Sequence, residues 1–141
     1  MVVENSDTNF GSRREAREIA LGILYAADNH NQNLVDYLNN QPLPPEEFVA
    51  DLITGIAENS ERIDTIIDDF AEGWSTNRMP AIDRALLRMA VYEVIYRPDI
   101  PIEAILSEAV TLASEYSTEQ SSKFINGVVA NIAKEERTAT H

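Results

Sequence analysis

The spacing of apolar residues between sparse chain breakers most constrains the fold of this 141-residue chain. Apolar residues recur three and four positions apart rather than two, the spacing of helices with one buried face. Only six prolines and five glycines interrupt the pattern. No alternating run typical of a strand occurs, nor any repeat of roughly 20 to 50 residues. The sequence therefore predicts an all-α fold.

About seven helices fit between the breakers. The fifth, at 81–96, is apolar on most faces, which is typical of a central helix. Pro80 opens it, since a proline at a helix start loses no hydrogen bond. The other helices are expected at about 13–28, around 34–38, from 45 to 56, from 60 to 70, at 102–115, and after Ser117 or Ser121.

The two ends of the chain are expected to differ from its middle. Residues 1–11 are polar, acidic and aperiodic, and they predict a disordered acidic arm. Ser12 and Glu15 have the spacing of a capping box, so the first helix should begin there. A single helical domain is expected over 12–137, with fraying after residue 134 and a frayed tail at 138–141.

The net charge is −13, from 11 basic and 24 acidic residues. Spread evenly, this charge would argue against a general nucleic-acid binder, because affinity for phosphate scales with cationic contacts. The charge is uneven, however: residues 31–77 carry −9 and residues 99–120 carry −5. A cationic face therefore stays open if the first helix, the fifth helix and the start of the last helix meet.

Several classes of chemistry are excluded by composition and motif. There is no cysteine, which rules out disulfides, thiolate zinc sites and iron–sulfur ligation. The two histidines are isolated, and no phosphate-binding, dinucleotide, zinc-protease or hydrolase motif occurs. The sequence predicts no enzyme, no metal and no cofactor. No signal peptide or membrane span is visible, which fits a cytoplasmic protein.

Three arginines lie within the first two turns of the first helix: Arg13, Arg14 and Arg17. Arg13 and Arg17 share a helix face, and Arg14 lies about 100° around from Arg13. Arginine at a helix N-terminus slightly opposes the helix dipole, which favours a use other than stability. The three arginines can bind phosphates, and the alternative is a solvated face paired with Glu15 and Glu18.

Other residues admit two interpretations each. Tyr25 and Phe124 are candidate stacking platforms for unpaired bases, although aromatics at helical spacing more often belong to the core. Gly127 inside the last helix predicts close approach of another backbone or of a ligand. Arg88 in an apolar stretch predicts a buried arginine paired with a carboxylate or with carbonyls. Trp74 is expected to pack back on the fourth helix.

Three blocks of the sequence are informative in combination. The first contains residues 13–17 (RREAR), Ala20-Leu21 and Tyr25. The second contains Gly73-Trp74-Ser75, Arg78-Met79-Pro80 and residues 82–88 (IDRALLR), followed by Tyr92-Glu93. The third contains Ile100-Pro101, Glu108-Ala109-Val110 and residues 123–128 (KFINGV). Over about residues 12–133, these blocks resemble the NusB family of bacterial transcription antitermination factors.

The resemblance implies a fold and a function. The fold would be two packed three-helix bundles. The function would be non-catalytic: binding the single-stranded boxA element of nascent ribosomal RNA together with NusE, a small-subunit ribosomal protein, as part of an RNA polymerase antitermination complex. A homodimer stays open, because some relatives form one.

The resemblance also assigns residues to surfaces. The RNA side would carry Arg13, Arg14, Arg17, Tyr25, Lys123 and Phe124, with Asn126 able to read a base edge. The NusE side would carry Asp83, Arg84, Tyr92 and Glu93.

Two other functions stay open. One is a helical adaptor that binds only protein, which the acidic arm favours. The other is a stand-alone NusB-like domain related to RNA cytosine methyltransferases, although a chain of 141 residues has no room for a catalytic domain.

Overall fold

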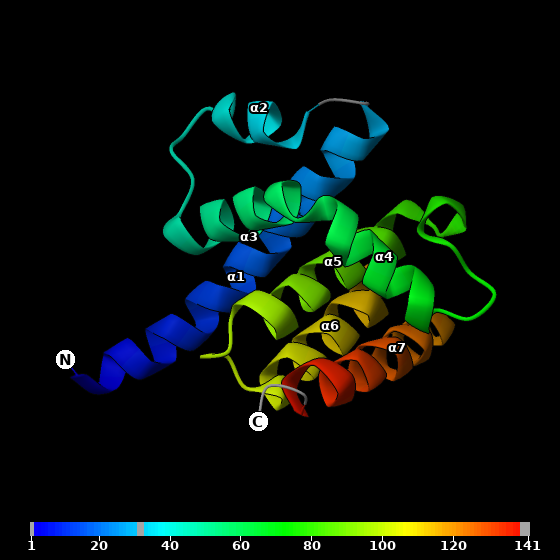
Figure 1. Ribbon diagram of the computed structural model, residues 1–141. Helices are drawn as coiled ribbons and strands as arrows, with labels where there is room; N and C mark the ends of the chain where they lie inside the picture. Colours follow the sequence, from blue (N-terminus) through cyan, green and yellow to red (C-terminus); the bar gives the residue numbers. More distant parts are fainter. Residues whose placement is uncertain (1, 31–32, 139–141) are drawn as a thin grey trace. The chain divides into compact units, whose positions relative to one another are not determined.

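The computed structural model describes the backbone of residues 2–30 and 33–138 and the side chains of 13–30 and 33–137. Within that part, seven α-helices and one short 3-10 helix occur and no strand, so the all-α prediction is confirmed (Figure 1). The elements are α1 (Val2–Asn29), α2 (Leu34–Asn39), α3 (Glu47–Glu58), α4 (Ser60–Phe70), η1 (Thr76–Arg78), α5 (Ala81–Tyr96), α6 (Ile102–Tyr116) and α7 (Glu119–Thr138).

The chain divides into two compact units, residues 1–54 and residues 55–141. In the first unit, α1 contacts α2. The buried residues of α1 include Ala16, Ala20 and Leu24, at the four-residue spacing that the sequence predicts for a helix with one apolar face. Asn33 begins α2 by accepting a hydrogen bond from the backbone N–H of Asp36 at 3.1 Å.

The second unit is built around α5. This helix contacts α4, α6 and α7, and α6 also contacts α7. Most of its residues are buried, including Leu86, Leu87 and Val91, so the prediction of a central fifth helix is confirmed. Its bounds are those expected from the sequence, because Pro80 immediately precedes it and cannot donate a helical hydrogen bond.

The start of α7 differs from the sequence prediction. Thr118, rather than Ser117 or Ser121, caps the helix: its Oγ1 accepts a hydrogen bond from the backbone N–H of Ser121 at 2.9 Å. The hydroxyls of Ser117 and Ser121 bind Asp83 instead.

The N-terminal part also differs. The sequence predicts a disordered arm over 1–11, whereas α1 extends from Val2 through that stretch to Asn29. No proline occurs between Val2 and Ser12, so nothing stops the helical hydrogen-bond ladder there. A serine is tolerated inside a helix at a small cost, and the capping pattern at Ser12 therefore does not mark a helix start.

The sequence predicts that α7 frays after residue 134, whereas the helix continues and is anchored by hydrogen bonds of Arg137. Its guanidinium donates to four backbone carbonyls: from Nε to Val94 at 3.0 Å, from Nη1 to Ile100 at 2.8 Å, and from Nη2 to Arg97 at 2.9 Å and Glu93 at 3.2 Å. These carbonyls lie at the C-terminal end of α5 and just after it, where a helix leaves acceptors without partners. The predicted tail is helical at Thr138, and residues 139–141 lie outside the described part.

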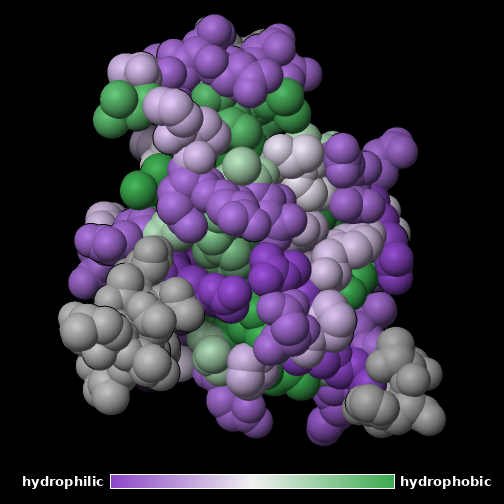
Figure 2. Space-filling model, turned by 90° about the vertical axis from the view of Figure 1, so that its left-hand side faces the viewer, coloured by the Kyte–Doolittle hydropathy of each residue, from purple (hydrophilic) through white to green (hydrophobic). Residues whose placement is uncertain are grey.

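Hydrophilic side chains predominate on the face shown in Figure 2, as 25% charged residues would suggest. In the part of the chain that the structure describes, no helix is long and apolar enough to cross a membrane.

Candidate nucleic-acid interface

The three arginines of α1 have different surroundings. Arg17 is only 5% exposed, and its Cζ lies 5.4 Å from the ring centroid of Phe48, at the start of α3. The Cζ of Arg13 lies 4.9 Å from the same ring, and Arg13 is half-buried. Both distances are within the range of cation–π contact. Arg14 is exposed. Of the three, Arg14 is therefore the arginine best placed to meet a phosphate.

Tyr25 lies on the same helix, and 39% of its surface is exposed. Eleven residues separate it from Arg14, which is close to three full turns, so the two side chains share a face. Along the helix axis they are about 16 Å apart. This face of α1 therefore presents a cation and an aromatic ring, the two kinds of group with which proteins bind single-stranded nucleic acids.

The predicted residues on α7 form a second face. Lys123 and Asn126 are exposed, Phe124 is half-buried, and Gly127 is exposed. Lys123, Asn126 and Gly127 are three and four residues apart, so they lie on one side of the helix. A Cβ placed on Gly127 would meet no atom within 4 Å. The prediction of a close backbone neighbour is thus wrong for the described part of the chain, and approach by a ligand stays a prediction.

The candidate RNA-binding residues belong to both units. Arg13, Arg14, Arg17 and Tyr25 lie in the first unit, and Lys123, Phe124 and Asn126 lie in the second. The two sets are therefore described as two separate candidate sites.

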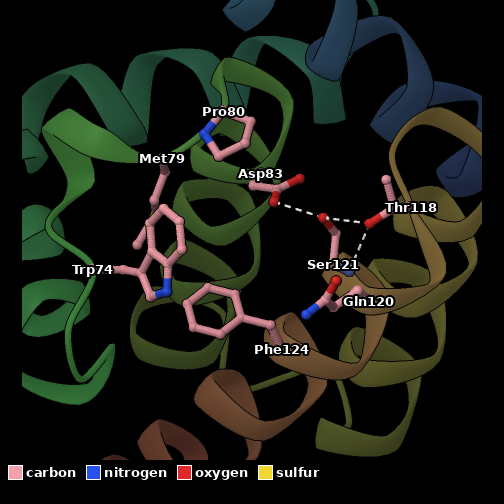
Figure 3. A pocket seen from close by; sticks show the side chains of 8 residues that line it. All are labelled: Trp74, Met79, Pro80, Asp83, Thr118, Gln120, Ser121 and Phe124. Atoms are coloured by element: carbon pink, nitrogen blue, oxygen red, sulfur yellow. Dashed lines mark hydrogen bonds between the residues drawn. The ribbon is translucent and has the colours of Figure 1, made fainter.

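Phe124 lines two hollows of the second unit. The larger, of about 590 Å³, runs between α7 and the end of α4 and includes Lys123 and Lys134. The smaller, of about 250 Å³, we name the Trp74 pocket (Figure 3). Its lining combines four apolar with four polar side chains: Trp74, Met79, Pro80, Phe124, Asp83, Thr118, Gln120 and Ser121.

Trp74 is a residue that sequence reasoning assigned wrongly. It is 50% exposed rather than packed on α4. One residue earlier, Gly73 has φ +80°, a conformation that favours glycine. The backbone N–H of Trp74 bonds the carbonyl of Ala71 at 3.0 Å, which closes the turn.

Asp83 is buried at the edge of this pocket, with 5% of its surface exposed. Its two carboxylate oxygens accept hydrogen bonds from the hydroxyls of Ser117 and Ser121, both at 2.7 Å. The first turn of α5 is thereby tied to the turn between α6 and α7. The predicted partner-binding role of Asp83 thus falls on a side chain that is already engaged within the unit.

The other residues predicted to contact a protein partner are also engaged internally. Arg84 donates to the backbone carbonyls of Thr76 at 2.8 Å and Met79 at 3.0 Å. Tyr92 and Glu93 are 6% and 2% exposed. A partner could reach only a small part of these side chains, and their contact with NusE stays a prediction.

Arg88 pairs with a carboxylate as its apolar context predicts, but its side chain is half-buried rather than buried. Its Nε and Nη2 donate to the two carboxylate oxygens of Asp64, both at 2.8 Å, which joins α5 to α4. Within the described residues, no group of three histidine or acidic side chains could hold a metal ion.

Replacing Asp83 with alanine is expected to lower the free energy of unfolding by about 2–3 kcal/mol, because two hydrogen bonds to a buried charge are lost. Asp83→Asn should lower the free energy of unfolding by less, because the amide oxygen can still accept a hydrogen bond from one of the two serines. Urea denaturation followed by circular dichroism measures both. Glu115→Ala, at an exposed acid of α6, is the control and should change stability by less than about 0.5 kcal/mol. An equal effect of Asp83→Ala and Glu115→Ala would contradict the assignment.

The model of the NusB family matches residues 14–134. The chain belongs to the NusB family. The matched range covers the three sequence blocks apart from Arg13, so the resemblance over about residues 12–133 is confirmed.

Known NusB proteins are similar to this chain in sequence and in fold. The transcription antitermination protein NusB of Kineococcus radiotolerans is 40% identical over 131 residues, covering 90% of this chain and 96% of the relative. A solved structure of T. maritima NusB superimposes with a TM-score of 0.79 at 36% identity, covering 88% of this chain and 92% of that one. A crystal structure of antitermination factors NusB and NusE in complex with dsRNA gives a TM-score of 0.73 at 28% identity, covering 87% and 96%.

Proposed function

We propose that this chain is a transcription antitermination factor that binds boxA-type single-stranded RNA of nascent ribosomal transcripts together with NusE and supports read-through by RNA polymerase. The observation that carries the proposal is membership of the NusB family together with a NusB–NusE–RNA complex among the similar structures. The role is binding rather than catalysis.

The described surfaces support an RNA-binding role. On α1, exposed Arg14 can neutralise a phosphate, and Tyr25 on the same face can stack a base. On α7, exposed Lys123 and Asn126 offer a second cation and an amide. Stacking on an aromatic side chain needs bases that are free of a duplex, which favours single-stranded RNA.

The charge of the chain supports a role for a basic partner. A net charge of −13 opposes RNA binding by this chain alone, since few cationic contacts are available to release counterions. NusE would add basic surface. The same acidity also favours the adaptor alternative, in which the chain holds NusE and has no contact with RNA.

Arginine substitution separates the two functions. With NusE present, Arg14→Ala is expected to weaken binding of a labelled boxA-like RNA and to reduce the slope of log affinity against log salt by about 0.7, the value for one phosphate of a single strand. Fluorescence anisotropy at several salt concentrations measures this change. Arg17 is left unchanged, because it is buried against Phe48.

The control is Arg62→Ala, which removes an exposed arginine that pairs with Glu136 at 3.5 Å in the second unit. It should leave the salt slope unchanged. A slope that is unaltered by Arg14→Ala would contradict the phosphate role of this residue. NusE binding with no RNA affinity at any salt concentration would establish the adaptor instead.

A further inference from the structure

The connection between α2 and α3 exposes a continuous apolar run. Residues 42–45 (PLPP) are all exposed, and so are the two glutamates that follow them. Leu43 is 77% exposed, the highest value among the exposed large hydrophobic residues of the described part. Single apolar residues on a surface are normal, whereas a run of about four indicates a function. The run, drawn as the irregular loop between α2 and α3 in Figure 1, is therefore a candidate contact surface of the first unit.

The loop is anchored at both ends within its own unit. At its start, the side-chain Nε2 of Gln41 donates to the backbone carbonyl of Tyr37 in α2 at 3.1 Å. At its end, a carboxylate oxygen of Glu46 accepts from the backbone N–H groups of Phe48 and Val49 at 3.1 and 3.3 Å, which caps α3. The position of the run is therefore fixed on both sides.

Proline restricts the backbone of the run. The rings of Pro42, Pro44 and Pro45 fix φ at about −65°, and a residue that precedes proline is restricted to extended or polyproline II conformation. The second restriction applies to Leu43 and Pro44. Polyproline II conformation is therefore favoured over residues 43–45 in the free chain, and little conformational entropy remains to be lost on binding.

The main chain of the run is available for recognition. Within the described part of the chain, no hydrogen bond joins the backbone groups of 42–45 to another residue. Their carbonyls can accept from the hydroxyl of a tyrosine or the indole N–H of a tryptophan in a partner. Such aromatic side chains line the grooves in which proteins bind P-x-x-P segments, and Pro42 and Pro45 have this spacing.

The charge that follows the run limits the kind of partner. Glu46 and Glu47 come directly after the last proline, and no lysine or arginine occurs between residues 31 and 61. A basic side chain at the end of the partner's groove would complement these carboxylates, whereas an acidic one would repel them. Charge complementarity therefore adds a basic groove end to the aromatic lining.

We propose that residues 42–47 (PLPPEE) are a docking motif for a second protein, which binds them in an aromatic-lined groove with a basic residue at its end. Leu43 and the prolines supply apolar contact, and the two glutamates fix the direction of the segment in the groove. This inference goes beyond the proposed function, because the motif requires neither RNA nor NusE.

Photo-cross-linking of the full chain tests the motif. A benzoylphenylalanine takes the place of exposed Asn40, just before the run, and the chain is irradiated in an extract of the source organism. A synthetic peptide of residues 40–47 is the competitor, and the same peptide with Pro44→Ala and Pro45→Ala is its control. We expect an adduct that the competitor abolishes and the control peptide leaves nearly unchanged. Mass spectrometry of the adduct should place the cross-link beside aromatic residues of the captured protein.

Variants of the full chain then measure the contribution of each part. Leu43→Ala should weaken binding of the captured protein about 10-fold, because a leucine side chain is no longer buried in the groove. Glu47→Lys should weaken it most at low salt, where charge interactions are least screened. Ile19→Ala, at a residue of α1 that is 53% exposed, is the control and should leave the affinity unchanged. Urea denaturation of each variant verifies that it is folded.

Three results would overturn the motif. The first is the absence of any adduct that the competitor peptide reduces. The second is an adduct that forms equally well with Leu43→Ala and in the presence of either peptide. The third is a cross-link to a second copy of this chain, or to a site without aromatic residues. None of these results bears on RNA binding with NusE, so the proposed function is tested separately.

Discussion

Replacing Arg137 with alanine is expected to lower the free energy of unfolding by about 3 kcal/mol. The guanidinium donates to four backbone carbonyls, three of them within 3.0 Å. A hydrogen bond from a charged donor contributes about 1.5–3 kcal/mol net. The carbonyls of Glu93 and Arg97 would keep backbone N–H donors, from Arg97 and Ile100, so the loss falls mainly on the carbonyls of Val94 and Ile100. Arg137 is half-buried, so water can replace part of the lost interaction, which keeps the expected loss of stability well below the sum for four such hydrogen bonds.

Thermal and urea denaturation measure this effect, and the melting temperature should fall by roughly 10 °C. Arg137→Lys should be intermediate, because an ammonium group has three donors and lacks the planar fork. The control Arg62→Ala removes a side chain that is 57% exposed, and it should cost less than about 1 kcal/mol. Equal losses for Arg137→Ala and Arg62→Ala would show that the four contacts do not stabilise the second unit.

Gly55→Ala is expected to destabilise the protein by about 2–3 kcal/mol, although alanine is the better helix former. A Cβ at Gly55 would overlap the ring of Tyr92. That ring is 6% exposed and stacks on Tyr96 with centroids 5.4 Å apart, so it has little room to move aside. Tyr92→Leu in the same chain should recover part of the loss, which a double-mutant cycle detects.

The matched control is Gly127→Ala on α7. No atom lies within 4 Å of the Cβ that it would add, so only the helix propensity changes. This substitution should raise the free energy of unfolding by about 0.5–1 kcal/mol. The same chemical change is thus expected to have opposite signs at Gly55 and Gly127. Equal signs in urea denaturation would contradict the packing described around Tyr92.

Local signals predict the helices of the second unit well. Pro80 and Pro101 immediately precede α5 and α6, and both helices begin where these residues place them. The dense apolar pattern of α5 predicts its central position, and Arg88 within that pattern predicts an ion pair with a carboxylate, which is formed with Asp64 at a half-buried site. These features depend on residues near in sequence or on burial alone, which periodicity reveals.

Contacts between distant residues could not be predicted in the same way. Asp83 meets Ser117 and Ser121, which lie 34 and 38 residues later in the chain. Arg137 reaches carbonyls around 40 residues earlier. From the sequence, a charged residue near a chain end is expected to be exposed to solvent. Its acceptors here are backbone carbonyls, which any residue type provides and which the sequence therefore does not reveal.

Binding of a labelled boxA-like RNA by this chain, alone and with NusE, tests the central claim most directly. The measurement is fluorescence anisotropy at fixed salt, with a scrambled RNA of equal length as the control. The account predicts weak binding by the chain alone and tight, sequence-dependent binding with NusE. Equal and negligible binding in both cases would contradict it.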